Sequence, residues 1–126
     1  MEKTTEEKAR ELTQLMEDGR GSDVTLMDLT GLNSWTDYFI LVTVSSSTQW
    51  QGLYKLVKDY ISENDLEIHK TKNKQEQGNE WNLIDLGNIV IHLMSEDARS
   101  FYELEKLWHG GKVLYSSKSS SSESSL

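Results

Sequence analysis

The stretch EWNLIDLGNIVIHLMSEDARSFYELEKLW, Glu80 to Trp108, decides the fold because it predicts two neighbouring strands, the turn between them and a helix. Gly87 and Asn88 stand between two apolar runs. Both residue types tolerate the positive φ angles of a two-residue hairpin turn. We therefore predict a β-hairpin whose turn is formed by these two residues.

The predicted hairpin has two faces of different composition, because successive side chains of a strand point to opposite sides of a sheet. One face is mixed in polarity and carries Trp81, Leu83, Asp85, Val90, His92 and Met94. The other face is aliphatic apart from Asn82 and carries Ile84, Leu86, Ile89, Ile91 and Leu93. We expect the aliphatic face to lie on the core. The mixed face either meets a polar partner or is covered by helices that satisfy Asp85 and His92 internally.

A helix is predicted to follow the hairpin. Ser95 is a helix-capping residue, and the acids Glu96 and Asp97 suit the positive end of a helix dipole. Helical spacing then gives an apolar stripe of Phe101, Leu104, Leu107 and Trp108, and a mixed flank of Ala98, Tyr102, Glu105 and His109. Gly110 and Gly111 end the predicted helix.

The composition limits the classes of protein to which the chain can belong. It has 126 residues, a formal net charge of −8 and no cysteine. The length suits one domain, and the acidic balance argues against direct binding to nucleic acid or to an anionic membrane. The absence of cysteine excludes disulfides and thiolate metal sites. The acidic balance favours a basic protein partner instead. No segment resembles a signal peptide or a membrane span, so we expect a cytoplasmic protein.

The N-terminal half of the chain contributes a helix and two strands. Thr4 and Glu7 have the spacing of a capping box, and the helical pattern after them ends at Gly19. A strand is predicted over residues 23–29. The run YFILVTV, Tyr38 to Val44, is the most apolar of the sequence and predicts a central strand that is buried on both faces.

A second helix, a weak strand and a loop are predicted between the central strand and the hairpin. The serines at positions 45–47 supply cap candidates, and Trp50, Leu53, Tyr54, Val57 and Ile61 then lie on one helical face. Residues 66–70 are expected to form a short strand and residues 71–79 a polar loop.

These elements predict an α/β (α+β) domain: a mixed β-sheet of four or five strands, with helices packed on it. We expect residues 1–112 to form a single domain. Residues 113–126 contain a Ser-rich segment that cannot bury apolar surface, and we expect them to be a disordered tail.

The sequence offers little support for an enzyme, and we predict none. The three histidines lack the spacing of a zinc helix, and the chain has no Gly-x-Ser-x-Gly elbow, P-loop or GxGxxG motif. Gly21 and Ser22 precede Asp23 and Asp28 in the manner of nucleotidyltransferase active sites, where two carboxylates hold a metal. The two acids are five residues apart and would point to opposite faces of a strand. We therefore expect no cofactor and no metal site.

Several blocks of the sequence occur in the order found in one protein family. The first block is TDYFILVTVSSSTQ, residues 36–49, and the second is the stretch from Glu80 to Trp108. The chain resembles the ribosomal silencing factor family, also called Iojap-like proteins. The residues on the matching positions are Asp37, Trp81, Asp85, Gly87, His92, Arg99, Tyr102, Leu104, Glu105, Leu107 and Trp108. It departs from the family pattern at Asn88, where an Asp is usual, and at Val44 and Thr48.

The resemblance implies a nucleotidyltransferase-like fold that lacks the catalytic carboxylates. It also implies a ribosomal silencing factor, which binds ribosomal protein number fourteen of the large subunit at the intersubunit face. Such a factor blocks joining of the small and large subunits and represses translation, notably under nutrient limitation. A role in assembly of the large subunit and a homodimer of the free protein are further implications.

We expect the partner-binding residues to be Trp81, Asp85, His92, Arg99, Tyr102 and Glu105. Residues 80–109 carry six acidic and two basic side chains, which gives them half of the net charge of the chain. An acidic surface is steered towards a basic ribosomal protein, and aromatic side chains beside it supply contact area. The alternatives are a structural role for these residues, with Asp85 and His92 as an internal pair. For the whole protein, the alternatives are a nucleotidyltransferase-like enzyme or an adaptor with another partner, including one that acts in large-subunit assembly.

Overall fold

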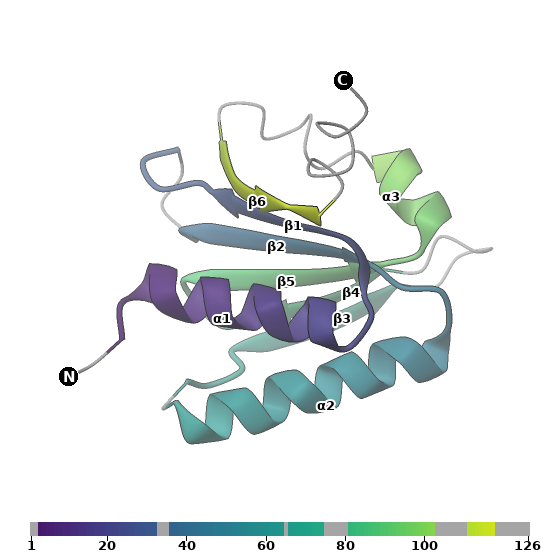
Figure 1. Ribbon diagram of the computed structural model, residues 1–126, viewed down its shortest axis with the longest axis horizontal. Helices are drawn as coiled ribbons and strands as arrows, with labels where there is room; N and C mark the ends of the chain where they lie inside the picture. The colour runs from purple at the N-terminus through teal and green to yellow at the C-terminus, as the bar shows by residue number, and fades with distance from the viewer. Residues whose placement is uncertain (1–2, 33–35, 65, 75–80, 103–110, 118–126) are drawn as a thin grey trace.

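The computed structural model describes residues 3–32, 36–64, 66–74, 81–102 and 111–117. These residues form one mixed six-stranded sheet with the strand order β3-β4-β5-β2-β1-β6 (Figure 1). The strands are β1 (Ser22–Asp28), β2 (Tyr38–Thr43), β3 (Lys70–Lys74), β4 (Trp81–Asp85), β5 (Ile89–Met94) and β6 (Lys112–Ser116). Only β2 and β5 pair in parallel, and every other neighbouring pair is antiparallel. The predicted fold class is confirmed.

The two N-terminal helices begin at the predicted caps. Helix α1 (Thr5–Asp18) starts with a complete capping box, in which Thr4 and Glu7 each accept a hydrogen bond from the backbone of the other. Helix α2 (Ser47–Glu63) starts at Ser46, whose hydroxyl accepts a hydrogen bond from the backbone N–H of Gln49. Both boundaries therefore follow from local side-chain chemistry.

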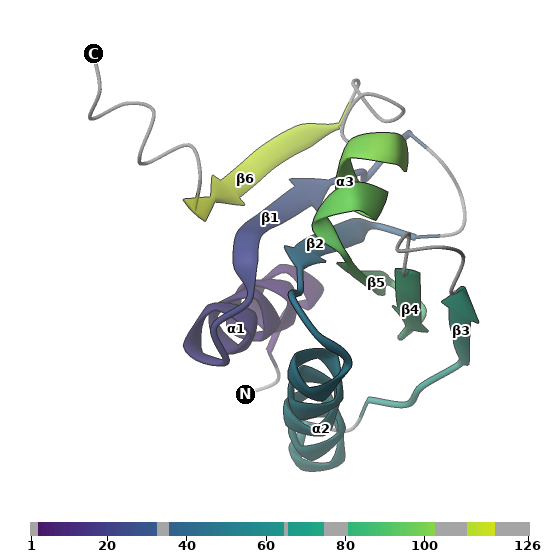
Figure 2. The same ribbon diagram turned by 90° about the vertical axis from the view of Figure 1, so that its right-hand side faces the viewer.

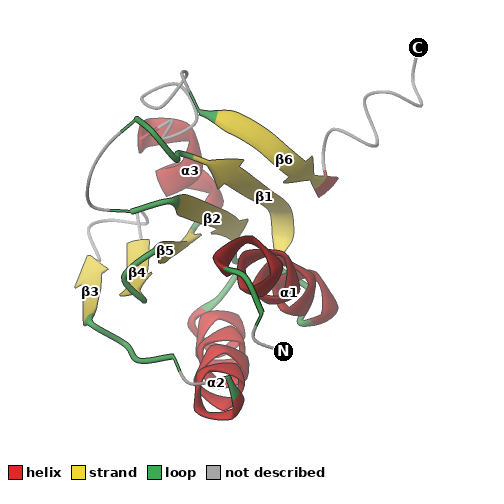
Figure 3. Cartoon of the chain, turned by 90° about the vertical axis from the view of Figure 1, so that its left-hand side faces the viewer, coloured by secondary structure: helices red, strands yellow, loops and turns green. Residues whose placement is uncertain are grey.

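The helices cover the two faces of the sheet unequally. Helices α1 and α2 lie on one face, and α3 (Glu96–Tyr102) lies on the other (Figures 2 and 3). The central strand β2 is buried along its whole length, as predicted, because it has helices on both sides. Two separate apolar clusters result, one under α1 and α2 and one under α3.

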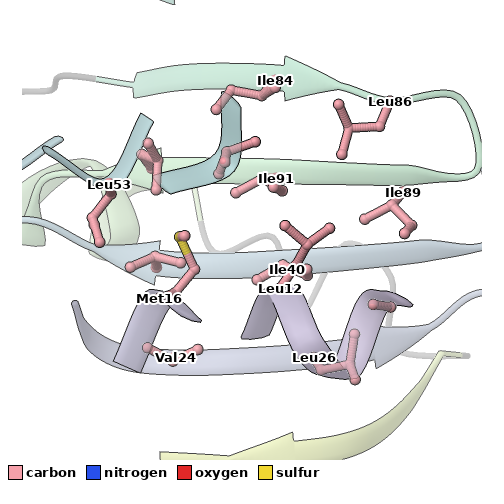
Figure 4. Close-up of a cluster of buried hydrophobic side chains, with 14 of the residues drawn as sticks. Leu12, Met16, Val24, Leu26, Ile40, Leu53, Ile84, Leu86, Ile89 and Ile91 are labelled. Carbon is pink, nitrogen blue, oxygen red and sulfur yellow. The ribbon is translucent and has the colours of Figure 1, made fainter. Parts of the chain in front are cut away.

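The larger cluster is aliphatic and lies between the sheet and the helices α1 and α2 (Figure 4). Its helical members include Leu12, Met16 and Leu53, which are at most 1% exposed. The sheet contributes Val24, Leu26, Ile40, Val42, Ile84, Leu86, Ile89, Ile91 and Leu93. The face of the hairpin that was predicted to lie on the core therefore does so, apart from Asn82, which is buried beside it.

The hairpin has the predicted register. Trp81 is opposite Met94, Leu83 is opposite His92, and Asp85 is opposite Val90. Gly87 has a φ of 93° in the turn, while Asn88 is not among the described residues with positive φ. The carbonyl of Asn88 instead accepts hydrogen bonds from the backbone N–H groups of Asp37 and Tyr38, so the turn is attached to the start of β2.

The weak strand before the hairpin lies later in the chain than predicted. Residues 66–69 are not part of a strand, and β3 occupies part of the segment that was predicted to be a polar loop. It pairs with β4 at the edge of the sheet. Strand pairing uses backbone groups, and Lys-rich edge strands are common because charge prevents further pairing. Polarity was therefore a poor guide to this element.

The sheet also includes residues 113–116, which were expected to belong to the disordered tail. Strand β6 pairs with β1 and makes a sixth strand, one more than the largest number predicted. The hydroxyl of Tyr115 donates a hydrogen bond to the Glu17 carboxylate of α1, and the Ser117 hydroxyl accepts one from the backbone N–H of Val24 at 3.0 Å. These contacts attach residues 112–117 to the domain. Residues 118–126 lie outside the described residues.

Helix α3 begins where the sequence predicted. The Ser95 hydroxyl accepts a hydrogen bond from the backbone N–H of Ala98 at 3.1 Å, and Glu96 and Asp97 occupy the first turn. Ala98 is fully buried in the smaller apolar cluster. The rest of the predicted helix, residues 103–109, lies outside the described residues.

Candidate functional site

The mixed face of the hairpin contains a row of half-buried side chains on β4. Exposure alternates along this strand: Trp81, Leu83 and Asp85 are half-buried, and the two residues between them are buried. Trp81 and Leu83 also pack against the smaller apolar cluster. We call Trp81, Leu83 and Asp85 the β4 row. It presents an indole, an aliphatic side chain and a carboxylate on one line at residue spacings of two.

His92 lies directly behind the β4 row and holds its indole. The Nε1–H of Trp81 donates a hydrogen bond to Nδ1 of His92 at 3.0 Å. The edge of the Phe39 ring packs against the imidazole, with ring centroids 4.5 Å apart and an interplanar angle of 71°. Because Nδ1 accepts this bond, we place the proton of the neutral ring on Nε2, which is buried and has no partner among the described residues. His92 is only 2% exposed, so its side chain leaves almost no surface for a partner.

The environment of His92 keeps the imidazole neutral. Burial is the larger cause and the positive charge of Arg99 the smaller one, and together they lower its pKa from the usual 6.5 to about 3. A charged imidazole would lose its hydration and could no longer accept the proton of Trp81. The ring therefore acts as a fixed neutral acceptor under ordinary conditions.

Asp85 makes a different contact from the one considered in the sequence. Its Oδ1 accepts a hydrogen bond from the backbone N–H of Gly87 at 2.8 Å, so the carboxylate closes the hairpin turn. The internal pair of Asp85 and His92 is not formed, since the imidazole nitrogen Nδ1 is bonded to Trp81. Asp85 remains half-buried and keeps part of its surface available.

Arg99 is a buried structural residue. It is 8% exposed and extends from α3 to β1 and β2. Nη1 donates to the backbone carbonyl of Asp23 at 2.8 Å and to the Thr43 hydroxyl at 3.0 Å, while Nη2 donates to the Thr25 hydroxyl at 3.1 Å. These bonds anchor the helix on the sheet. These described hydrogen bonds of Arg99 are internal, and its contact with a partner stays a prediction.

Two predicted contact residues, Tyr102 and Glu105, lie wholly or partly outside the described part of the structure. The backbone of Tyr102 ends α3, but its side chain lies outside the described part of the structure, and so does the whole of Glu105. Their roles stay predictions. Of the six predicted residues, the structure brings Trp81, Asp85, His92 and Arg99 to the same side of the sheet, with the first two in the β4 row.

Leu83 is a candidate contact residue that sequence reasoning missed. It lies between Trp81 and Asp85 in the β4 row and is half-buried like both of them. Its position on the mixed face was predicted, but it was not included among the predicted contact residues. The signal that could have found it is the period-two alternation, because any residue between two exposed positions of one strand face shares their exposure.

A polar cavity of about 590 Å³ lies where the parallel strands β2 and β5 end, which is the usual place for ligands in α/β sheets. It is lined by Ser22, Asp23, Thr43, Val44, Ser45, Ser95, Glu96, Asp97, Arg99 and Ser100. Asp28 is at the other end of β1 and accepts hydrogen bonds from Thr30 in a turn. Asp23 and Asp28 therefore do not form a nucleotidyltransferase pair.

Within the described residues, no three His, Cys, Asp or Glu side chains gather in a way that could hold a metal ion. A search of the same residues for a helix of sufficient length and apolar character to cross a membrane finds none.

Comparison with known proteins gives a consistent result. Residues 2–125 match the family described as ribosomal silencing factor during starvation. The ribosomal silencing factor RsfS of Bacillus subtilis is 36% identical over 92 residues, which cover 73% of this chain and 76% of the relative. The chloroplastic protein Iojap of Arabidopsis thaliana is 30% identical over 79% of this chain and 41% of its own length.

Solved structures resemble the fold over most of the chain. A crystal structure of a protein from Chromobacterium violaceum has a TM-score of 0.75 and 28% identity, and the alignment covers 91% of this chain and 93% of the other. A structure from Bacillus halodurans has a TM-score of 0.66 and 30% identity, with coverage of 81% and 94%. The match of the family over nearly the whole sequence, together with these relatives, shows that this chain belongs to the ribosomal silencing factor family.

Proposed function

We propose that this protein binds the large ribosomal subunit through ribosomal protein number fourteen at the intersubunit face. By occupying that face it blocks joining of the small and large subunits and represses translation, notably under nutrient limitation. Membership of the ribosomal silencing factor family supports the class of function. The contact surface that we propose is the β4 row on the mixed face of the hairpin.

The observation that carries the proposal is the β4 row. Three neighbouring positions are half-exposed and chemically varied, while the residues behind them, His92 and Arg99, are buried and hydrogen-bonded. An aromatic side chain held in one orientation loses little conformational entropy when a partner binds. Such preorganised aromatic anchors beside aliphatic surface are typical of the centre of a protein interface.

The negative charge of the protein favours its association with a basic partner. The chain has a net charge of −8, and Glu96 and Asp97 are exposed on α3 on the same side of the sheet as the β4 row. An acidic domain is attracted to a basic ribosomal protein and is repelled by bare RNA. Binding should therefore weaken as salt concentration increases, through a lower association rate.

Obstruction of subunit joining requires no chemistry. A folded domain seated on the intersubunit face excludes the small subunit by its volume, provided that it dissociates more slowly than subunits meet. The predicted absence of enzymatic activity is consistent with this mechanism. A homodimer of the free protein would compete with binding if it covered the same row.

The test uses purified subunits and two lysine variants. Wild-type protein should sediment with the large subunit in a sucrose gradient and reduce the peak of joined ribosomes in proportion to its dose. Leu83→Lys places a cation in the β4 row and should weaken binding by about tenfold or more, because it removes apolar contact and repels a basic partner. Val113→Lys is the matched control, since Val113 is 51% exposed on β6 at the other edge of the sheet.

Each outcome separates the alternatives. Equal binding by wild type and Leu83→Lys, with both variants folded, would remove the β4 row from the interface. Binding to the large subunit without any effect on joining would favour the adaptor in large-subunit assembly. Mg²⁺-dependent nucleotide turnover that persists through purification would favour the nucleotidyltransferase-like enzyme.

A further inference from the structure

A second cavity lies between α2 and the β3–β4 edge of the sheet. It has a volume of about 280 Å³ and is lined by Trp50, Tyr54, Thr71, Asn82, Leu83, Ile84 and Leu93. Two aromatic side chains come from the first half of α2, and the aliphatic side chains on the same face of the sheet are Ile84 of β4 and Leu93 of β5. The cavity is distinct from the polar one at the ends of β2 and β5, with which it shares no lining residue.

Two hydrogen-bond donors of this cavity's walls have no partner among the described residues. The Nδ2 atom of Asn82 and the Nε1 atom of Trp50 are both buried, and neither makes a hydrogen bond within the described part of the chain. Asn82 is 4% exposed and is the polar exception on the otherwise aliphatic face of the hairpin. Buried donors are almost always paired, so two orphans on the wall of one cavity require an explanation. They mark this cavity as a place where an acceptor is missing.

We propose that this cavity binds a small neutral molecule with a flat apolar body and carbonyl-type acceptors. None of the described lining residues is an acid, a lysine, an arginine or a histidine, so they offer no counter-charge to a charged group inside. The Trp50 and Tyr54 rings suit a flat body, because aromatic rings pack against one another in offset or tilted arrangements. The acceptors of the ligand pair with the N–H groups of Trp50 and Asn82.

The cavity is open to solvent on one side and is large enough for such a ligand. A space of 280 Å³ corresponds to about nine water molecules at about 30 Å³ each. The side chains that line it offer four polar groups, on Trp50, Tyr54, Thr71 and Asn82. Both orphan nitrogen atoms are covered, so the proposal requires the half-buried Trp50 indole at the start of α2 to rotate when the ligand binds.

The test compares two flat probes of similar size with the full chain in solution. Coumarin has carbonyl-type acceptors, while naphthalene has the same two-ring shape and none. Coumarin should shift the NMR signals of the Asn82 side-chain amide and the Trp50 indole N–H, and should bind at least fivefold more tightly than naphthalene. Equal affinity of the two probes, or shifts confined to other residues, would overturn the proposal and leave a hydrated cavity.

Three variants assign the effect to the two donors. Asn82→Leu and Trp50→Phe each remove one donor and keep the apolar wall, and each should weaken coumarin binding by about three- to tenfold, the net value of one hydrogen bond. Gln51→Leu is the control, because Gln51 is exposed on the same helix. Unchanged affinity in both donor variants, with thermal unfolding showing that they are folded, would also overturn the proposal.

The experiment is independent of the ribosome. It measures binding to the isolated protein, so its failure says nothing about the β4 row, and failure of the Leu83→Lys test says nothing about coumarin. The two results can therefore be read separately.

Discussion

The two faces of the sheet are built from different materials. The face under α1 and α2 is closed by aliphatic side chains from both helices and four strands. The face under α3 combines a smaller apolar cluster with the buried His92 and Arg99 and with the half-buried β4 row. One face is mainly aliphatic, and the other keeps polar groups in fixed positions near the surface.

This difference suggests a division of labour. Apolar burial contributes roughly in proportion to area and needs no particular geometry, so the first face can supply most of the stability. Hydrogen bonds between buried side chains add less net free energy of folding, but they fix the orientation of the side chains that they join. The second face can therefore determine how Trp81 is presented, through the acceptor nitrogen of His92.

The largest expected effect comes from the same truncation made on each face. Leu93→Ala opens a cavity in the aliphatic face, where Leu93 is fully buried, and should lower the free energy of unfolding by about 3 kcal/mol. Leu83→Ala in the β4 row should cost less, about 1 kcal/mol, because its side chain is already partly exposed to water. Chemical denaturation of both variants measures the difference. Equal losses would contradict the comparison.

The next effect concerns pH and acts on the second face. The pKa of His92 is about 3 in the folded protein and near 6.5 when unfolded, so below pH 6.5 the unfolded chain binds more protons. This contribution to stability is therefore complete above pH 6.5 and is lost as the pH falls towards 3. At pH 5 the loss should be about 2 kcal/mol.

Denaturation curves at pH 7 and pH 5 measure this loss. His92→Phe removes the titrating group and should reduce the pH dependence, while His69→Gln removes an exposed histidine and should leave it unchanged. If the pH dependence of stability disappeared in the His69 variant and persisted in the His92 variant, His92 would not be its cause.

A smaller effect tests the turn that sets which side chains lie on which face. Gly87→Ala should destabilise the protein by about 1–2 kcal/mol, because φ is 93° and the new Cβ would lie 3.2 Å from Cε1 of His69. Gly52→Ala in α2 meets nothing within 4 Å and should stabilise by about 0.5–1 kcal/mol. Thermal unfolding of the pair should give shifts of opposite sign. Shifts of the same sign would show that the turn is not strained by a side chain.

Local patterns were enough for the elements that depend on neighbours in the sequence. The capping residues Thr4, Ser46 and Ser95 were all identified as cap candidates, because a cap needs only a side chain three residues from a backbone N–H. The register of the hairpin followed from its turn for the same reason. Strands β3 and β6 were misplaced, because edge strands can be polar and their pairing is decided by backbone groups elsewhere.

The roles of the predicted site residues could not be obtained in this way. The sequence selected Trp81, Asp85, His92 and Arg99 from a resemblance, and it could not say which were exposed. The bond from Trp81 to His92 joins two strands, and the bonds from Arg99 reach Thr25 and Thr43, which are 74 and 56 positions away. Such distances in sequence carry no periodic signal.

By itself, the sequence determined the hairpin and its two faces, the central strand and the starts of the helices, since these follow from side-chain alternation and capping within a few residues. Only the tertiary structure decided that His92 and Arg99 are buried while the side chains of the β4 row are partly exposed. It also placed Asn82 and Trp50 on one cavity wall, where their side-chain nitrogen atoms have no acceptor among the described residues. The reason is that burial and partner choice depend on which distant elements pack together, and packing is a property of the whole chain.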